Sequence, residues 1–148
     1  MRTLIVLVLL LVNSTAFAFT FAPTNNSLEP NFLPVEQAFK LSIDAPQNGI
    51  IKANWFIHEG YYLYQSKLSL SGPHADKLHF AALPKGEDKT DKYFGDVIVY
   101  KHQLSLPIYY DITLPAGTKI AAIIHYQGCA EKGLCYAPQE QPIEFTVP

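Results

Sequence analysis

The sequence predicts an all-β protein with the fold of an immunoglobulin-like antiparallel β-sandwich. Seven short segments carry alternating, β-branched or aromatic patterns that are typical of strands. Turn signals separate these segments at intervals of about a dozen residues. No window is helical over enough residues to form a βαβ unit, which argues against thioredoxin-like and Rossmann folds. A small barrel is the alternative architecture.

The first element along the chain is a predicted signal peptide, residues 1–18. Arg2 provides a positive charge, residues 4–12 read LIVLVLLLV, and Ala16-Phe17-Ala18 has the pattern of a cleavage site. The apolar run is shorter than the roughly 20 residues that a membrane-spanning helix needs. We therefore expect cleavage before Phe19 and export to an oxidising compartment outside the cytoplasm. An uncleaved membrane anchor is the alternative.

A polar leader without periodicity, residues 19–31, precedes the predicted domain, residues 32–148. The domain begins with a short helical turn within residues 32–39, where Pro34 stands at the start of the turn. The predicted strands follow at residues 38–43, 50–57, 61–70, 78–83, 97–110, 119–126 and 142–147. Turn signals lie between them at residues 46–49 (PQNG), 59–60 (EG), 71–73 (SGP) and 114–117 (LPAG).

Composition narrows the class of function. The chain has 148 residues, of which 49% are hydrophobic and 16% charged, so a single domain can bury a core and disorder is excluded. The net charge is −2, and the one arginine, Arg2, lies in the predicted signal peptide. Nucleic-acid binding depends on basic patches and arginine contacts, so this class of function is excluded as well.

The two cysteines, Cys129 and Cys135, stand in a C-x5-C pattern between the last two predicted strands. A hairpin can hold both opposite each other, with Gly133 in the turn. Three interpretations remain open: a local structural disulfide, a redox-active pair, and a copper or zinc site completed by His125. A loop of about seven residues gives roughly 2.4 kcal/mol of loop-closure stabilisation, against about 4.7 for a hundred residues. The short loop therefore weakens the purely structural interpretation.

Three stretches of sequence resemble a known family. These are YQGCAEKGLCYAPQ at 126–139, GYYLY at 60–64 and FLPVEQAF at 32–39. Together they resemble the N-terminal periplasmic domain of the thiol:disulfide interchange protein DsbD, over nearly all of residues 32–147. The resemblance implies an immunoglobulin-like sandwich that acts as a protein-disulfide reductase, in which Cys129 and Cys135 cycle between dithiol and disulfide. No cofactor is implied, because the two sulfur atoms carry both electrons.

The resemblance also implies partners. The family's domain takes electrons from a membrane-embedded domain through a thioredoxin-like domain. It passes them to periplasmic acceptors, which include the disulfide isomerase DsbC and thioredoxin-like proteins of cytochrome c maturation. By this resemblance, the domain is free-standing or the soluble part of a longer inner-membrane protein.

Several site residues follow from the same resemblance. Cys135 is implied to form the mixed disulfide with the partner, and Tyr62 and Tyr64 to line the active site. On a strand, Tyr62 and Tyr64 share one face, while Tyr61 and Leu63 share the other. An ordinary half-buried aromatic stripe is the alternative for the two tyrosines.

Asp91-Lys92-Tyr93-Phe94-Gly95 resembles the family's cap loop, in which an acidic residue precedes an aromatic lid over the cysteines. The alternative is that Tyr93 and Phe94 anchor the loop in the core. Lys92 departs from the family, which often has a second acidic residue there. A lysine can favour a thiolate if its ammonium group reaches the sulfur.

Two functions from other classes remain as alternatives. One is a non-catalytic immunoglobulin-like binding module with a structural local disulfide. The other is a periplasmic copper- or zinc-binding domain that uses both cysteines and His125. The pattern predicts no metal site as the first choice, since no fourth ligand lies near these three in the sequence.

Overall fold

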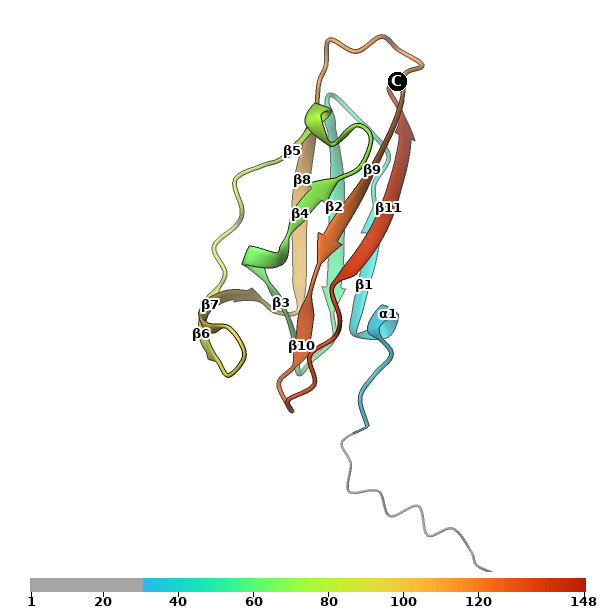
Figure 1. Ribbon diagram of the computed structural model, residues 1–148. Helices are drawn as coiled ribbons and strands as arrows, with labels where there is room; N and C mark the ends of the chain where they lie inside the picture. The colour runs from blue at the N-terminus through green and yellow to red at the C-terminus, as the bar shows by residue number, and fades with distance from the viewer. Residues whose placement is uncertain (1–30) are drawn as a thin grey trace, which may run out of the picture.

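The computed structural model describes residues 31–148, and strands dominate this part of the chain (Figure 1). The predicted signal peptide and all but the last residue of the predicted leader lie outside the described residues. Among residues 31–148, no helix has the length and apolar character needed to cross a bilayer. The elements are α1 (Val35–Ala38), β1 (Phe39–Ile43), β2 (Ile50–Ile57), β3 (Tyr61–Tyr64), β4 (Ser69–Ser71), β5 (Leu78–Phe80), β6 (Glu87–Asp91), β7 (Gly95–Tyr100), β8 (Gln103–Tyr110), β9 (Lys119–Tyr126), β10 (Gly128–Ala130) and β11 (Gln139–Thr146), with 3₁₀ turns η1 (Gln65–Lys67) and η2 (Ala75–Lys77).

The strands pair in antiparallel fashion in two layers, which confirms the predicted fold class. One layer is the sheet β1-β2-β8-β5, and the sheet β11-β9-β4 lies across from it (Figure 1). A third sheet, β10-β3-β7-β6, extends the second layer at one end of the domain. The extension is continuous because β10 follows β9 after the single residue Gln127, whose carbonyl accepts a hydrogen bond from Tyr64 N at 3.0 Å.

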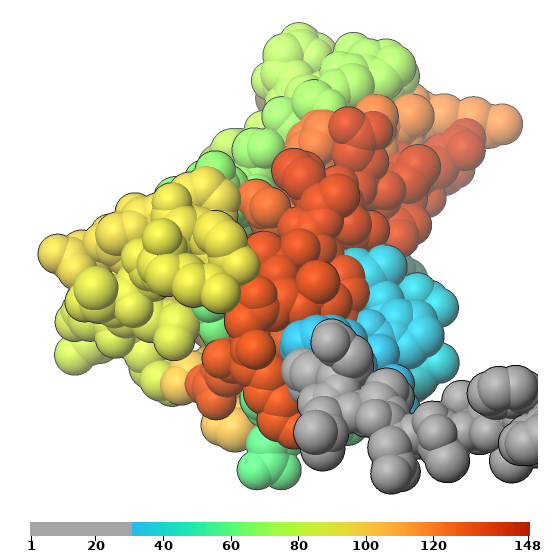
Figure 2. Space-filling view, turned by 60° about the horizontal axis from the view of Figure 1, so that its bottom comes forward, coloured from blue at the N-terminus to red at the C-terminus, as the bar shows by residue number. Residues whose placement is uncertain are grey.

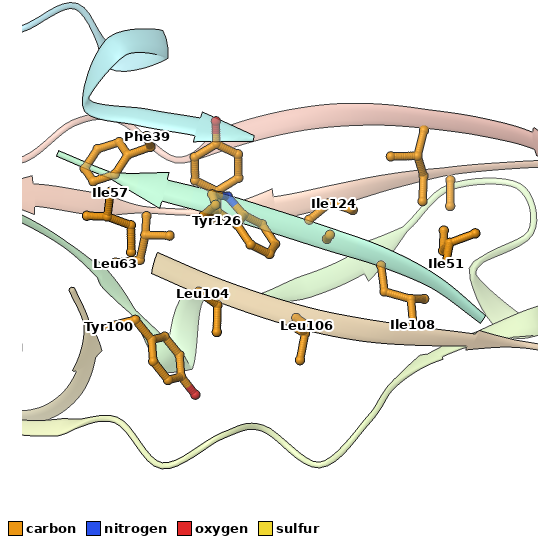
Figure 3. Close-up of a cluster of buried hydrophobic side chains, with 14 of the residues drawn as sticks. Phe39, Ile51, Ile57, Leu63, Tyr100, Leu104, Leu106, Ile108, Ile124 and Tyr126 are labelled. Carbon is orange, nitrogen blue, oxygen red and sulfur yellow. The ribbon is translucent and has the colours of Figure 1, made fainter. Parts of the chain in front are cut away.

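The core lies between the two layers and is built by alternation along three long strands. Every second residue of β2, β8 and β9 points inward and is buried. Trp55 of β2 meets Tyr126 of β9 edge to face, with ring centres 5.8 Å apart. Figure 3 shows how the remaining side chains fill the interior around them. The inward residues are Ile51, Ala53, Trp55 and Ile57 from β2, Leu104, Leu106, Ile108 and Tyr110 from β8, and Ile120, Ala122, Ile124 and Tyr126 from β9.

Two of the predicted strands are each broken into two, and the breaks create the third sheet. The segment 61–70 is interrupted by η1, so β3 and β4 lie in different sheets. The segment 97–110 bends at His102, whose φ of 62° is in the left-handed region. The bend sends β7 to the third sheet and leaves β8 in the first.

Other boundaries differ in smaller ways. Strands β6 and β10 were not predicted, because β6 is a charged run and β10 is only three residues long. The predicted strand 78–83 ends at Phe80, and the last strand begins at Gln139 instead of Pro142. The predicted helical turn is present as α1, with Pro34 as its N-cap residue.

Candidate functional site

The cysteines close a short hairpin at the end of the domain, which we call the cysteine hairpin (residues 128–136). Cys129 belongs to β10, and a disulfide joins it to Cys135 with 4.0 Å between the Cα atoms. Backbone hydrogen bonds hold the same turn: Ala130 N donates to Leu134 O at 2.7 Å, and Gly133 N to Ala130 O at 2.9 Å. Gly133 has a φ of 106°, as the turn requires. The disulfide is therefore local and does not cross the core.

The two sulfur atoms differ in exposure. Cys129 is fully buried, because β10 pairs with β3 and places Cys129 opposite Tyr62. Cys135 lies outside the strands and is partly exposed. Gly128 allows this close packing, since a Cβ atom there would collide with the backbone carbonyl of Tyr62 and with the ring of Phe39. A partner molecule thus reaches Cys135 more easily than Cys129.

Two tyrosines from β3 and one aspartate from β6 converge behind the disulfide. Tyr62 OH and Tyr64 OH both donate to Asp91 Oδ2, at 2.7 Å and 2.9 Å. The Tyr64 oxygen also lies 3.0 Å from Cys129 Sγ and 3.8 Å from Cys135 Sγ. The structure therefore brings together the tyrosines, the aspartate and the cysteines that the sequence singled out, and Tyr62 and Tyr64 share one face of β3 as expected.

The buried carboxylate of Asp91 is fully hydrogen-bonded. Its other oxygen, Oδ1, accepts from the backbone N–H groups of Tyr93 at 2.7 Å and Phe94 at 3.2 Å. Burial acts to raise the pKa of Asp91, but the four donated hydrogen bonds outweigh it and hold the pKa below its usual value. Burial and the bond to Asp91 raise the pKa of Tyr62, and burial raises that of Tyr64 to about 12. At neutral pH the site thus holds a charged carboxylate and two neutral hydroxyl donors.

The cap loop, residues 91–95, connects β6 to β7 and reaches the cysteine hairpin. Tyr93 OH donates to Gly133 O at 3.0 Å, and the Phe94 ring meets the Tyr64 ring edge to face at 5.0 Å. The two side chains are 53% and 44% exposed, so neither anchors the loop in the hydrophobic core. Gly95, with a φ of 70°, begins β7 after the loop.

Two lysines that no sequence motif connected to the site also lie at it. Lys67 of η1 and Lys89 of β6 place their ammonium groups over aromatic rings of the site, and Gly133 accepts the hydrogen bond from the cap loop. Alternation along β6 could have identified Lys89, because Lys89 and Asp91 share a face. Lys92 Nζ lies 4.7 Å from the centre of the Tyr93 ring.

His125 does not join the cysteines. Its Nε2 lies 2.6 Å from Ser71 Oγ, and its Nδ1 lies 3.8 Å from a carboxylate oxygen of Glu140. Within the described part of the chain, no group of three or more His, Cys, Asp or Glu side chains is arranged to hold a metal ion. The metal-binding alternative therefore lacks a ligand set among these residues.

The fold and this site define a class of protein: an all-β sandwich with a local disulfide at one end, set against hydrogen-bonded tyrosines and a buried aspartate. An aromatic loop contacts the cysteine hairpin and one of the tyrosines. A family model described as "Thiol:disulfide interchange protein DsbD, N-terminal" matches residues 29–147. The chain belongs to this family, as the sequence resemblance indicated.

Individual relatives agree with this assignment. The chain is 38% identical to thiol:disulfide interchange protein DsbD 2 of Pseudomonas aeruginosa over 98% of this chain and 24% of the relative. It is 38% identical to DsbD of Vibrio cholerae over 90% of this chain and 21% of the relative. The chain thus spans about a quarter of the length of the curated relatives it matches.

Two solved structures from Neisseria meningitidis are similar at 33% sequence identity. The reduced DsbD N-terminal domain aligns with a TM-score of 0.68, over 77% of this chain and 89% of that chain. The complex of the DsbD N-terminal domain with the PilB N-terminal domain aligns with a TM-score of 0.64, over 77% and 87%. The Cys129–Cys135 disulfide fits the thiol:disulfide interchange role named in this family.

Proposed function

We propose that this chain is a periplasmic thiol:disulfide interchange domain that acts as a protein-disulfide reductase through Cys129 and Cys135. The observation that carries the proposal is a local disulfide with one buried and one partly exposed sulfur, set against the hydroxyl of Tyr64. A bond that closes only its own hairpin can open without releasing the two layers of the sandwich. Export follows from the predicted signal peptide, residues 1–18.

The exchange proceeds in two steps, with Cys135 as the attacking sulfur. In the reduced domain, the Cys135 thiolate attacks a disulfide of the acceptor, forms a mixed disulfide and releases one acceptor thiolate. Cys129, as a thiolate, then attacks Cys135 Sγ and releases the second acceptor thiolate. Two electrons have passed to the acceptor, and Cys129–Cys135 is a disulfide again. A dithiol donor reduces it by the same steps in reverse.

Exposure and hydrogen bonding support this order. Cys135 is the partly exposed sulfur, so a partner's disulfide can approach it. Tyr64 donates its single hydrogen to Asp91, and its oxygen therefore presents a lone pair to Cys129 Sγ. In the reduced domain this oxygen accepts a hydrogen bond from the S–H group of Cys129, which favours the thiol form of Cys129. Cys129 thus waits as a thiol until the mixed disulfide has formed.

The cap loop covers the pair between encounters. Tyr93 bonds to the cysteine hairpin at Gly133, and Phe94 packs on Tyr64, so the two rings shield the sulfurs from small oxidants. Both rings are about half exposed, and few contacts need to break for the loop to move aside when a partner docks.

The proposed partners are thioredoxin-like proteins. The donor is a thioredoxin-like domain of a membrane-embedded DsbD-type protein, and the acceptors are a DsbC-like isomerase and thioredoxin-like proteins of cytochrome c maturation. The solved complex of a DsbD N-terminal domain with a PilB N-terminal domain supports a protein partner. With such partners the domain turns over as a reductase.

Trapping with single-cysteine variants tests the proposal. Cys129→Ala leaves Cys135 without a resolving thiol, so we expect it to hold a mixed disulfide with an oxidised thioredoxin-like acceptor on non-reducing gels. Cys135→Ala serves as the matched control and is expected to trap poorly. Equal trapping by both variants would contradict the assignment of Cys135, and no trapping by either would favour the non-catalytic binding module.

A further inference from the structure

Three lysines from two segments lie around the disulfide end of the domain: Lys67 of η1, and Lys89 and Lys92 of the β6–β7 hairpin. Each has its ammonium group over a different aromatic ring. Distances from Nζ to the ring centre are 4.4 Å for Lys67 over Phe94, 4.8 Å for Lys89 over Tyr62 and 4.7 Å for Lys92 over Tyr93. The three rings belong to the site itself. Each ring face attracts its ammonium group weakly at an exposed site, so the positive charges are favoured beside the aromatic rings of the site.

A fourth lysine completes this arrangement from the cysteine hairpin. Lys132 is exposed and borders, together with Lys89 and Lys92, a surface hollow of about 300 Å³ between the cap loop and the hairpin. Figure 2 looks onto this end, where the β6–β7 hairpin (yellow) lies against the segment that contains the cysteines (orange-red). We call the four residues Lys67, Lys89, Lys92 and Lys132 the lysine collar.

Among residues 31–148, no carboxylate forms an ion pair with any of the four collar lysines. Two acidic residues border the same hollow, but both are engaged: Asp91 is buried and accepts four hydrogen bonds, and Glu131 pairs with Lys101 at 3.0 Å. Three other carboxylates lie nearby: Glu59 borders a neighbouring hollow together with Lys132, and Asp88 and Asp96 border another together with Lys89. Asp96 accepts a hydrogen bond from Thr90 at 2.9 Å. Within the hollow between the cap loop and the hairpin, the exposed charges without an ion-pair partner are those of the lysines.

This local charge contrasts with the chain as a whole, whose net charge is −2. A basic rim around exposed aromatic rings has the composition of a docking surface, since aromatic side chains contribute most of the binding energy and rim charges steer the encounter. Tyr93 and Phe94 provide the exposed rings at its centre.

We propose that the lysine collar selects partner proteins whose exchanging disulfide is flanked by carboxylates. The proposal deepens the proposed function and rests on it. On docking, Asp or Glu side chains of the partner pair with the collar and draw the ammonium groups away from the rings. The aromatic side chains of the cap loop are then free to move aside from Cys135. A partner with lysines or arginines around its disulfide meets like charge and docks slowly.

Peptides that differ only in charge test this preference. Three synthetic peptides carry the same Cys-Gly-Pro-Cys disulfide, flanked by glutamates, by glutamines or by lysines. The rate at which the reduced domain reduces each is measured at low and at high salt and divided by the rate with free dithiothreitol. We expect the glutamate peptide to react about tenfold faster than the lysine peptide at low salt, and the difference to shrink as salt screens the charges.

Two triple variants separate the collar from general charge. Lys67→Gln, Lys89→Gln and Lys92→Gln together are expected to remove most of the preference for glutamate. The matched control changes three lysines on other parts of the domain, Lys40→Gln, Lys52→Gln and Lys119→Gln, and is expected to keep it. The single variant Lys92→Glu is expected to lower the rate for the glutamate peptide and raise that for the lysine peptide. Equal preference in the wild type and the collar variant would overturn the proposal.

A binding measurement keeps this result apart from the proposed function. The oxidised domain is titrated with the glutamate peptide in which both cysteines are replaced by serine, so no exchange can occur. The proposal is supported if the binding is sensitive to salt, is lost in the collar variant and is kept in the control variant. Absence of such binding overturns the proposal. Failure to reduce any peptide would contradict the interchange function itself. The titration would still show whether the lysine collar binds the glutamate peptide.

Discussion

Asp91→Asn removes the buried charge of Asp91 next to the disulfide and tests whether that charge sets the acidity of the cysteines. Asp91 Oδ2 lies 2.9 Å from the Tyr64 oxygen, which lies 3.0 Å from Cys129 Sγ, so carboxylate and sulfur are no more than about 5.9 Å apart. Asparagine keeps the size of the side chain and retains one oxygen for the hydrogen bonds. The charge is the main property that changes.

The expected magnitude follows from Coulomb's law. Two like charges about 6 Å apart repel by about 3 kcal/mol at an effective dielectric constant of about 20. That energy corresponds to a change of about two in a pKa. In the reduced domain, Asp91 therefore disfavours the Cys129 thiolate, and Asp91→Asn is expected to lower the pKa of the Cys129 thiol by about two. The freed hydroxyl of Tyr64 can also turn toward the thiolate and lower the pKa further.

The pKa is measured from the cysteine ¹³Cβ chemical shifts of the reduced domain across a pH titration. Asp111→Asn is the matched control, because that carboxylate also accepts hydrogen bonds, from Thr113 N at 2.9 Å and Thr113 OH at 2.6 Å. It follows β8 at the end of the sandwich away from the cysteine hairpin (Figure 1). An unchanged or higher pKa of Cys129 in Asp91→Asn would refute the electrostatic reasoning, as would an equal fall in the control.

Three further predictions concern the same end of the domain. Replacing Tyr93 and Phe94 with alanine should speed alkylation of the reduced cysteines. It should lower the free energy of unfolding in urea by only about 1–2 kcal/mol for each ring, because each is about half exposed. An unchanged alkylation rate with a much lower melting temperature would assign the loop a structural role. Gly128→Ala should cost at least about 1–3 kcal/mol in urea unfolding, since its Cβ atom would press on the Tyr62 carbonyl and the Phe39 ring. Gly128 does not have a positive φ, so an unchanged stability would contradict the steric argument. Because the pKa of Asp91 is lower in the folded than in the unfolded state, its contribution to stability is complete above about pH 5 and is lost as the pH falls below about 4 toward the folded-state pKa. The free energy of unfolding should therefore fall less steeply with decreasing pH in Asp91→Asn than in the wild type. An identical pH profile would contradict the prediction.

Much of the fold was predictable because alternation is strong along the strands that build the core. In β2, β8 and β9 every second residue is apolar and buried. Strands β2 and β9 have the predicted bounds, and β8 ends at the predicted residue. Strand β6 was missed for a physical reason. It lies at the edge of its sheet, where only one neighbour pairs with it, and its EDKTD sequence carries charge on both faces.

The parts of the site that lie within one short sequence motif were predictable. The parts that the fold brings together from distant segments were not. Cys129 and Cys135 lie within one hairpin. The family resemblance placed Tyr62 and Tyr64 at the site, and period-two alternation placed them on one face of β3. The contact of Asp91 with both tyrosines depends on the pairing of β3, β7 and β6, which no local pattern specifies. The same holds for Lys67, which is near Phe94 only because η1 interrupts the predicted strand.

The hydrogen bonds within the cysteine hairpin have a consequence for the timing of each transfer. The hydrogen bonds donated by Ala130 N and Gly133 N do not involve the sulfur atoms, so we expect reduction to leave them in place and the two thiols side by side. Well-oriented intramolecular groups react as if their partner were present at roughly 10⁵–10⁸ M, far above any free thiol in solution. Once a mixed disulfide has formed on Cys135, its own neighbour Cys129 outcompetes every external thiol. External thiols therefore do not divert the exchange, and the choice of acceptor is made at docking.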